Sequence, residues 1–339
     1  MLPVDRILRQ TTKPSKYNIL EMITHERYQE TLAKTGHNFY LLNPKAEGIK
    51  EFWNTKHAPI PKNYKLLKKV EGNDIINRVL ASLPNITYDF ILCHQRFGQY
   101  QFCRPLAQVL GIPIILIEHT LPVQAWPKGR VDQMAELKGD FNICITNFNR
   151  KEWKWDAVAE VITHAIDTDV FSMGEEQREN TILTVANDYI NRDYVLNYGL
   201  YKRVTEGLSV RPVGDTPGLS KAPNDLSELI KTYQTSSIFF NSANWSPVPM
   251  SMLEAMSCGC AVVSMNTCAV PNYITHGENG YLANDEKEAR LYLRELLNDD
   301  KLRKRFGEAA RKTIQEKCSL TRFCSEWNNV FERAFNVKM

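Results

Sequence analysis

The sequence predicts an α/β fold with two domains, each built on a parallel sheet, and three observations support this prediction. Short apolar segments of strand length alternate with helical patterns along the chain. The alternation starts again after a charged segment near residues 167–179, which is the best candidate for a linker. The length of 339 residues also fits two domains of roughly 100–200 residues each.

The alternation assigns most of the chain to elements. Strands are expected at 17–24, 38–42, 88–94, 112–119, 141–146, 161–165, 181–185, 208–213, 237–241 and 261–265. Helices are expected at 25–35, 100–110, 194–204 and 251–257, and glycines follow three of them, as is common at helix ends. Three further helices finish the chain, the first opening with a capping-box pattern at Asp285 and Glu288. The last carries an apolar stripe of Phe323, Trp327, Phe331 and Ala334, so it should dock on an apolar surface.

Composition excludes several classes of protein. Hydrophobic residues make up 43% and charged residues 24%, as in ordinary globular proteins, and a net charge of +3 does not indicate general nucleic-acid binding. Asp5, Arg6 and Arg9 interrupt the apolar core that a signal peptide would need, and no apolar run reaches the ~18–20 residues of a membrane span. The eight cysteines contain no CxxC pair. We therefore expect a cytoplasmic protein with free thiols.

Several segments match the motifs of a known family in the family's order. They are 117–120 (IEHT), 166–171 (IDTDVF), 213–218 (VGDTPG), 249–259 (PMSMLEAMSCG), 262–264 (VVS) and 277–282 (GENGYL). With these motifs the chain resembles the retaining GT-B glycosyltransferases of family 4, the glycosyl transferases group 1, most strongly over 185–335. The resemblance implies two Rossmann-like domains with parallel sheets facing a central cleft: an acceptor domain at 1–170 and a donor domain at 171–320. The helix at 321–339 would pack back toward the N-terminal domain.

The resemblance also implies a reaction. A hexose or pentose would pass from a nucleotide sugar, UDP- or GDP-linked, to a hydroxyl of a glycan, a glycolipid or a small molecule, with retention. No cofactor and no metal is expected, because a helix dipole and cations would stabilise the departing diphosphate. Asp167 and Asp169 form a DxD pattern, but they fall in the hinge motif.

For the donor, the resemblance assigns roles to residues that suit them chemically. Glu254 would accept hydrogen bonds from the ribose hydroxyls, because a carboxylate is a strong acceptor. The amides of Met250, Ser251 and Met252 open a helix and would bind the diphosphate. The turn at Gly214 and Asp215 would also lie at the donor.

In the N-terminal half, His119 ends a buried strand, where open α/β sheets bind ligands. The resemblance makes it a catalytic contact of the donor sugar. His25 and His94 also follow strands, and with Arg96 they are acceptor-side candidates. For His25 and His94 a structural role is equally open.

Four departures from the family pattern stand out. Asn187 occupies the place of an arginine, and Arg192 falls near that of a catalytic lysine, with Lys202, Arg203 and Arg211 as alternative cations. Ser246 stands eight positions before Glu254, where the family has a sugar-binding glutamate. The glycine-rich loop after the first strand is replaced by MITHERYQE at 22–30. These changes predict an unusual donor or acceptor.

Three other interpretations stay open. The acceptor could be a hydroxylated base, such as a hydroxymethylated one, in DNA, contacted by the basic stretches 6–16 and 62–69. The chain could be a GT-B binding module that has lost turnover with its first glutamate and glycine loop. The basic stretch near Lys62 could instead make peripheral contact with a membrane.

Overall fold

The computed structural model describes residues 14–337, which form two compact units. Unit 1 contains residues 14–163 and 321–337, and unit 2 contains residues 164–320. The division thus falls after Thr163, ahead of the expected position between 170 and 171. The reason is that the intervening segment bonds within unit 2: the Ile166 amide donates to the Cys318 carbonyl at 3.0 Å, and Arg311 donates to the Thr168 carbonyl.

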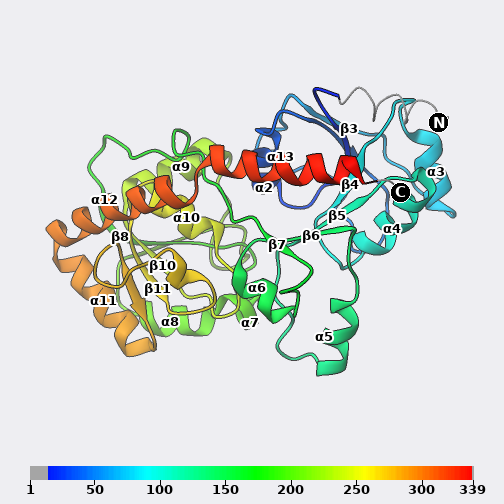
Figure 1. The fold of residues 1–339 in the computed structure, drawn as a ribbon. Helices are drawn as coiled ribbons and strands as arrows, with labels where there is room; N and C mark the ends of the chain where they lie inside the picture. The colour runs from blue at the N-terminus through cyan, green and yellow to red at the C-terminus, as the bar shows by residue number, and fades with distance from the viewer. Residues whose placement is uncertain (1–13, 338–339) are drawn as a thin grey trace. The chain divides into compact units, whose positions relative to one another are not determined.

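Unit 1 is built on a seven-stranded parallel sheet with the strand order β3-β2-β1-β4-β5-β6-β7 (Figure 1). Its strands are β1 (Asn18–Met22), β2 (Asn38–Leu42), β3 (Tyr64–Leu66), β4 (Phe90–Cys93), β5 (Ile114–Glu118), β6 (Phe141–Cys144) and β7 (Glu160–Val161). Its helices are α2 (Glu26–Ala33), α3 (Ile75–Ser82), α4 (Gln99–Leu110), α5 (Lys128–Ala135), α6 (Asn147–Glu152) and α13 (Leu320–Asn336). The order of the first six strands is that of the Rossmann fold.

The two faces of this sheet bury different helices, because successive strand residues point to opposite sides. Leu20 and Met22 of β1 belong to the core that includes α3 and α4. On the other face, Phe90 of β4 stacks on Phe331 of α13 at 5.1 Å between ring centroids. The apolar stripe of α13 is fully buried within unit 1, and Figure 1 shows this helix, in red, beside α2.

Unit 2 is a five-stranded parallel sheet in the order β12-β11-β10-β8-β9. Its strands are β8 (Glu179–Val185), β9 (Val210–Val213), β10 (Ser236–Asn241), β11 (Ala261–Met265) and β12 (Tyr281–Ala283). Its helices are α7 (Asp193–Leu196), α8 (Tyr198–Thr205), α9 (Leu226–Thr235), α10 (Met250–Ser257), the short 3-10 helix η1 (Val270–Asn272), α11 (Glu286–Asn298) and α12 (Asp300–Lys317). One core lies under α9, α10 and α12, and a second lies under α8 and α11.

The expected α/β fold with two parallel sheets is therefore confirmed, while several elements differ in detail. The helix expected at 194–204 is divided into α7 and α8 by Asn197, whose left-handed backbone (φ 56°) breaks the helix. The strand expected at 161–165 is reduced to the two residues of β7. Two edge strands of three residues, β3 and β12, are too short to give an alternating pattern. Among residues 14–337, no helix is both long enough and apolar enough to cross a membrane.

Candidate active site

Open α/β sheets bind ligands in the loops at the carboxyl ends of their strands. The favoured place is the point where the strand order changes direction. In unit 1 this point lies between β1 and β4, and in unit 2 it lies between β8 and β10. The candidate residues are best considered at these two points, one in each unit.

A small hollow lies at this point in unit 2. It is lined by the ends of β8 and β10 and by the start of α10, through Thr184, Val185, Ala186, Tyr189, Leu196, Phe239, Phe240, Asn241, Ser242, Ala243, Pro249 and Ser251. Three of its polar lining residues are held by hydrogen bonds. Tyr189 and Ser242 are hydrogen-bonded to each other, and Asn241 donates to Ser264 at 2.8 Å. The hollow itself is small, with a volume of about 30 Å³, so it marks a fixed point at the strand ends and is no nucleotide-sized cavity.

Helix α10 begins beside this hollow without a side-chain cap. Its N-cap residue is Pro249, which has no side-chain acceptor for the first amides. The amide of Met252, expected to bind the ligand, instead donates to the Pro249 carbonyl at 3.2 Å. Met250 and Ser251, both half-buried, open the helix ahead of it. Their N–H groups and the positive end of the helix dipole are suited to an anion.

Glu254 lies one turn further along α10, and its carboxylate is enclosed. The residue is 4% exposed, and its Oε2 accepts a hydrogen bond from the hydroxyl of Tyr233 at 3.0 Å. Burial, and then the charge of Glu254, raise the pKa of Tyr233 well above its usual value. The phenol therefore stays protonated and remains a donor, and it orients the carboxylate. Sequence reasoning did not single out Tyr233, although its place in the last turn of the helix before a buried strand was a usable signal.

The turn at Gly214 meets the end of β8. Gly214 has a φ of 126°, and a Cβ there would lie 2.0 Å from the Ala186 carbonyl oxygen, so only glycine fits. Asn187, at the family's arginine position, uses its Oδ1 to accept the Asp215 amide at 2.8 Å. Asn187 thus has a structural role, because its side chain holds this turn against the end of β8. The role in donor binding stays a prediction.

The predicted cations of unit 2 differ in whether they are paired with a carboxylate. Arg192 is exposed at the N-cap of α7, so its side chain faces solvent. Arg203 is paired with Glu286, and Arg211 lies 3.9 Å from Glu179. Lys202 is exposed, and Ser246 is half-buried in the loop between β10 and α10. Arg192 and Lys202 are the predicted cations whose side chains reach solvent most freely.

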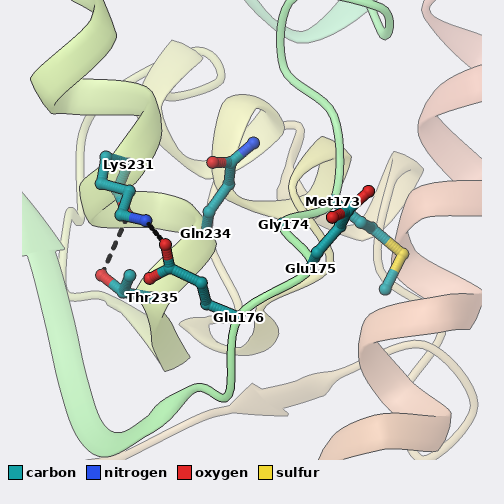
Figure 2. A pocket seen from close by; sticks show the side chains of 7 residues that line it. All are labelled: Met173, Gly174, Glu175, Glu176, Lys231, Gln234 and Thr235. Carbon is teal, nitrogen blue, oxygen red and sulfur yellow. Dashed lines mark hydrogen bonds and ion pairs between the residues drawn. The ribbon is translucent and has the colours of Figure 1, made fainter.

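A second and larger hollow of unit 2 has a volume of about 310 Å³. Figure 2 shows it between the segment at 173–176 and α9, with Lys231 paired to Glu176 on one side. Its residue Thr235 directly precedes β10, and Glu176 shortly precedes β8. It therefore lies at the amino ends of the strands, the edge opposite to the ligand side, so we do not assign a site to it.

In unit 1 the corresponding point gathers a carboxylate and three histidines. Glu21 of β1 contacts Nε2 of His94, and Nδ1 of His94 lies 3.2 Å from Nε2 of His119. The His119 ring meets the His25 ring edge-on at 4.7 Å between centroids. Glu21 and His94 are fully buried, His119 is half-buried and His25 is exposed. Tyr28 of α2 lies against the His119 ring at 4.7 Å. The structure thus brings His25, His94 and His119 together.

Sequence reasoning missed Glu21, and a signal was present. A charged residue inside an otherwise apolar strand is rarely buried without a partner. Its Oε2 and the Tyr64 hydroxyl are both buried, and neither has a hydrogen-bond partner among residues 14–337. Burial, and then the charge of Glu21, raise the pKa of Tyr64 well above its usual value. The phenol keeps its proton and can donate to this carboxylate.

The segment that carries His119 is anchored by Glu118, which points to the opposite face of the sheet. Glu118 accepts the Thr120 amide at 2.8 Å and the Arg96 Nε–H at 2.7 Å. The Arg96 guanidinium is fully buried and lies 3.5 Å from the Trp153 ring centroid. Burial lowers the pKa of Arg96, and the charge of Glu118 opposes this. Arg96 is therefore part of the core, and its burial argues against the acceptor-side role predicted for it.

The turn after β1, which replaces the family's glycine loop, is held by two glutamines. Gln29 accepts the Thr24 amide at 2.9 Å and donates to the Met22 carbonyl at 3.0 Å. Gln99 donates to the Thr24 hydroxyl at 2.7 Å. Only a short turn therefore separates β1 from α2, and His25 at the carboxyl edge is the N-cap residue of α2.

Glu26, the first residue of α2, fixes the loop after β2. It is 3% exposed, and it is paired with Lys50 and accepts the Asn54 amide at 2.8 Å. Burial acts to raise its pKa, but the hydrogen bonds from His57, Lys50 and Asn54 outweigh it and lower the pKa to about 2. The loop over this edge is thus held by a carboxylate that stays charged.

Within 14–337, no group of three or more His, Cys, Asp or Glu side chains could hold a metal ion. The eight cysteines are all free, and six of them are buried.

Comparisons with known proteins agree with these features. Residues 221–313 match the family model of the glycosyl transferases group 1. The N-acetyl-alpha-D-glucosaminyl L-malate synthase of Bacillus anthracis is 24% identical over 211 residues, which are 58% of this chain and 49% of that protein. An uncharacterized glycosyltransferase of Methanocaldococcus jannaschii is 29% identical over 115 residues, 33% of this chain and 29% of that one. The chain thus spans about half or less of these relatives' lengths.

Solved structures share the fold over nearly the whole chain. The sucrose-phosphate synthase of Thermosynechococcus elongatus superimposes with a TM-score of 0.74 at 11% identity, covering 94% of this chain and 99% of that one. Anabaena HepE, solved with UDP and glucose, gives a TM-score of 0.73 at 12% identity, covering 93% and 99%. At such identities the likeness shows the GT-B fold alone. The match at 221–313 and these structures thus show that the chain is similar to the group 1 glycosyl transferases.

Proposed function

We propose that the chain is a retaining, nucleotide-sugar-dependent glycosyltransferase that moves a hexose or pentose to a hydroxyl acceptor. One observation carries the proposal: the uncapped start of α10 lies beside the hollow where the strand order of unit 2 changes direction. A diphosphate there would accept from the amides of Met250 and Ser251. Glu254, oriented by Tyr233, would accept from the ribose hydroxyls.

The names of relatives support a nucleotide sugar as donor. Anabaena HepE was solved in complexes with UDP and with UDP-glucose. We extend this to a UDP- or GDP-linked donor for this chain. Stabilisation of the leaving diphosphate would come from the helix dipole and from Arg192 or Lys202, without a metal.

The acceptor would be a hydroxyl of a glycan, a glycolipid or a small molecule. Unit 1 supplies polar groups at its carboxyl edge, chiefly His119 and His25, with Thr24 behind them. Such groups exchange hydrogen bonds with hydroxyls. A hydrogen bond from His119 to the transferred sugar is part of the same proposal.

Two other partners remain predictions without a specific structural observation. Of the basic stretches proposed for DNA, residues 6–13 lie outside the described part of the chain. In the stretch at 62–69, Lys65 lies over the Tyr40 ring and Lys69 is paired with Glu51 and Glu71, so part of its charge is already used. Peripheral membrane contact near Lys62 likewise remains a prediction.

A thermal-shift screen with UDP, GDP and their sugars tests the proposal. A ligand at 100 times its dissociation constant stabilises the folded state by ~2.7 kcal/mol. We expect a clear rise in melting temperature with one nucleotide, and NMR of the product's anomeric proton would then test retention. A shift with a nucleotide but no transfer to any acceptor would favour the binding module that has lost turnover. No shift with any nucleotide would contradict the proposal.

A further inference from the structure

Tyr189 joins the two strand ends between which the strand order of unit 2 changes direction. It lies in the loop after β8, and its hydroxyl is hydrogen-bonded to Ser242, the first residue after β10. Ser242 in turn donates to the carbonyl of Leu196, the last residue of α7, at 2.6 Å. Tyr189 and Ser242 are each 2% exposed, so this chain of hydrogen bonds is shielded from water.

The carbonyl at the end of this chain fixes the direction of each hydrogen bond. A carbonyl oxygen can only accept, so the hydroxyl proton of Ser242 points to Leu196. The oxygen of Ser242 is then the acceptor for the hydroxyl of Tyr189. Burial raises the pKa of Tyr189 well above its usual range, and the hydrogen bond to Ser242 opposes this only in part. The phenol therefore keeps its proton and remains the donor.

Tyr189 is itself held on two further sides. Its amide donates to the hydroxyl of Thr216, in the turn after β9, at 3.0 Å. Because β8 lies between β9 and β10 in the sheet, Tyr189 thus contacts the loops of both neighbouring strands. Its ring packs against Tyr198 and Tyr201 of α8, at 5.3 and 5.1 Å between ring centroids. These contacts fix the ring, so its hydroxyl stays directed toward the loop after β10.

The segments joined in this way carry the proposed donor site. Helix α7 begins after Arg192, and the carbonyl of Val195 accepts the amides of Asn244 and Trp245, in the loop after β10, at 3.0 and 3.2 Å. That loop leads into α10, whose start lines the same small hollow as Tyr189. The loop after β10 is therefore bonded both to α7 and, through the buried chain of hydroxyl groups, to the loop after β8.

We propose that Tyr189 is a positioning residue for the donor: through Ser242 it fixes the loop after β10, and with it the start of α10, in the place where the first amides bind a nucleoside diphosphate. The inference rests on the proposed function, because the ligand is the one proposed for α10. A site that is ordered before binding loses less freedom when the ligand arrives. The hydroxyl of Tyr189 therefore contributes to affinity through Ser242, without contact with the ligand.

Calorimetric titration of the full-length protein with UDP and GDP, at a temperature where all variants are folded, tests the effect on affinity. Tyr189→Phe removes the hydroxyl and keeps the ring, so Kd should rise about 5–10-fold, the value of one hydrogen bond. The double variant with Ser242→Ala should bind no more weakly than Ser242→Ala alone, because both substitutions remove the same hydrogen bond. Tyr201→Phe, in the same aromatic cluster, is the matched control and should leave Kd unchanged.

Methyl NMR of methionine-labelled protein without nucleotide tests the positioning itself. Met250 is the first residue of α10, and Met22 lies in the core of unit 1. We expect Tyr189→Phe to shift the Met250 methyl signal and Tyr201→Phe to leave it in place. The Met22 signal should be the same in both variants and in the wild type.

Three results would overturn the inference: equal Kd values for wild type and Tyr189→Phe, effects on binding that simply add in the double variant, or a Met250 signal that Tyr189→Phe does not move. Failure of the wild type to bind either UDP or GDP would instead contradict the proposed function. The Met250 signal would then still decide whether the hydroxyl of Tyr189 positions the start of α10.

Discussion

The carboxyl edges of the two sheets present different kinds of hydrogen-bonding group. The edge of unit 2 offers backbone: the first amides of α10 and a turn at Gly214 that lies against the end of β8. The edge of unit 1 offers side chains, a line from Glu21 through His94 to His119. Backbone amides suit the diphosphate that UDP- and GDP-linked sugars share, whereas side chains can vary with the acceptor. Under the proposed function, unit 2 would bind the constant group of the donor and unit 1 the variable group of the acceptor.

The largest expected effect concerns the stability of unit 1. Glu118→Gln leaves the buried Arg96 guanidinium without its carboxylate, so the free energy of unfolding should fall by about 3–5 kcal/mol in urea titrations. Glu136→Gln, at an exposed ion pair with Lys138, is the control and should change it by less than about 0.5 kcal/mol. Equal effects of the two substitutions would show that the Arg96–Glu118 pair does not anchor the His119 segment.

The second prediction concerns nucleotide binding by unit 2. Glu254→Gln should weaken binding of the nucleoside diphosphate by about 100-fold, or ~3 kcal/mol, as two charge-assisted hydrogen bonds to the ribose are replaced by weaker ones. Tyr233→Phe removes only the group that orients Glu254 and should cost about 10-fold. Calorimetric titration measures both, with Glu308→Gln on α12 as the control. Unchanged affinity in Glu254→Gln would remove the ribose assignment.

The sequence predicted unit 2 more fully than unit 1, and the reason is physical. Met250 to Glu254 lie on one helix, so their spacing along the chain fixes their spacing in space. Glu21 and His94 are 73 residues apart and meet only because β1 and β4 are neighbours in the sheet. The burial of Arg96 beside Trp153 could not be predicted for the same reason, since it depends on a distant segment.

The third prediction returns to unit 1 and follows the low pKa of Glu26. Because this pKa is lowered from 4.5 to about 2, the carboxylate stabilises the fold fully above pH 4.5 and loses that contribution as the pH falls toward 2. Glu26→Gln should therefore cost about 1–3 kcal/mol at pH 7, less than full linkage because Lys50 and His57 are partly exposed. The difference between wild type and variant should shrink in urea titrations from pH 5 to pH 3. A difference independent of pH would contradict the assignment.

The smallest expected effect tests the departure at residue 187. Asn187→Arg restores the family's cation beside the hollow of unit 2 at an exposed position. It should strengthen diphosphate binding by about 0.5–1 kcal/mol, and the gain should decrease with added salt. The substitution also removes the acceptor of the Asp215 amide, so a small loss of stability is expected. Weaker binding would show that Asn187 holds the turn in the form that binds the donor.

The central claim is that the start of α10 binds the nucleotide, and methyl NMR of methionine-labelled protein tests it most directly. Met250 and Met252 report on α10, Met173 reports on the larger hollow of unit 2, and Met22 reports on the core of unit 1. The account predicts that UDP or GDP causes saturable shifts of Met250 and Met252 and leaves Met173 and Met22 unchanged. Saturable shifts confined to Met173 or Met22, or none with either nucleotide, would contradict it.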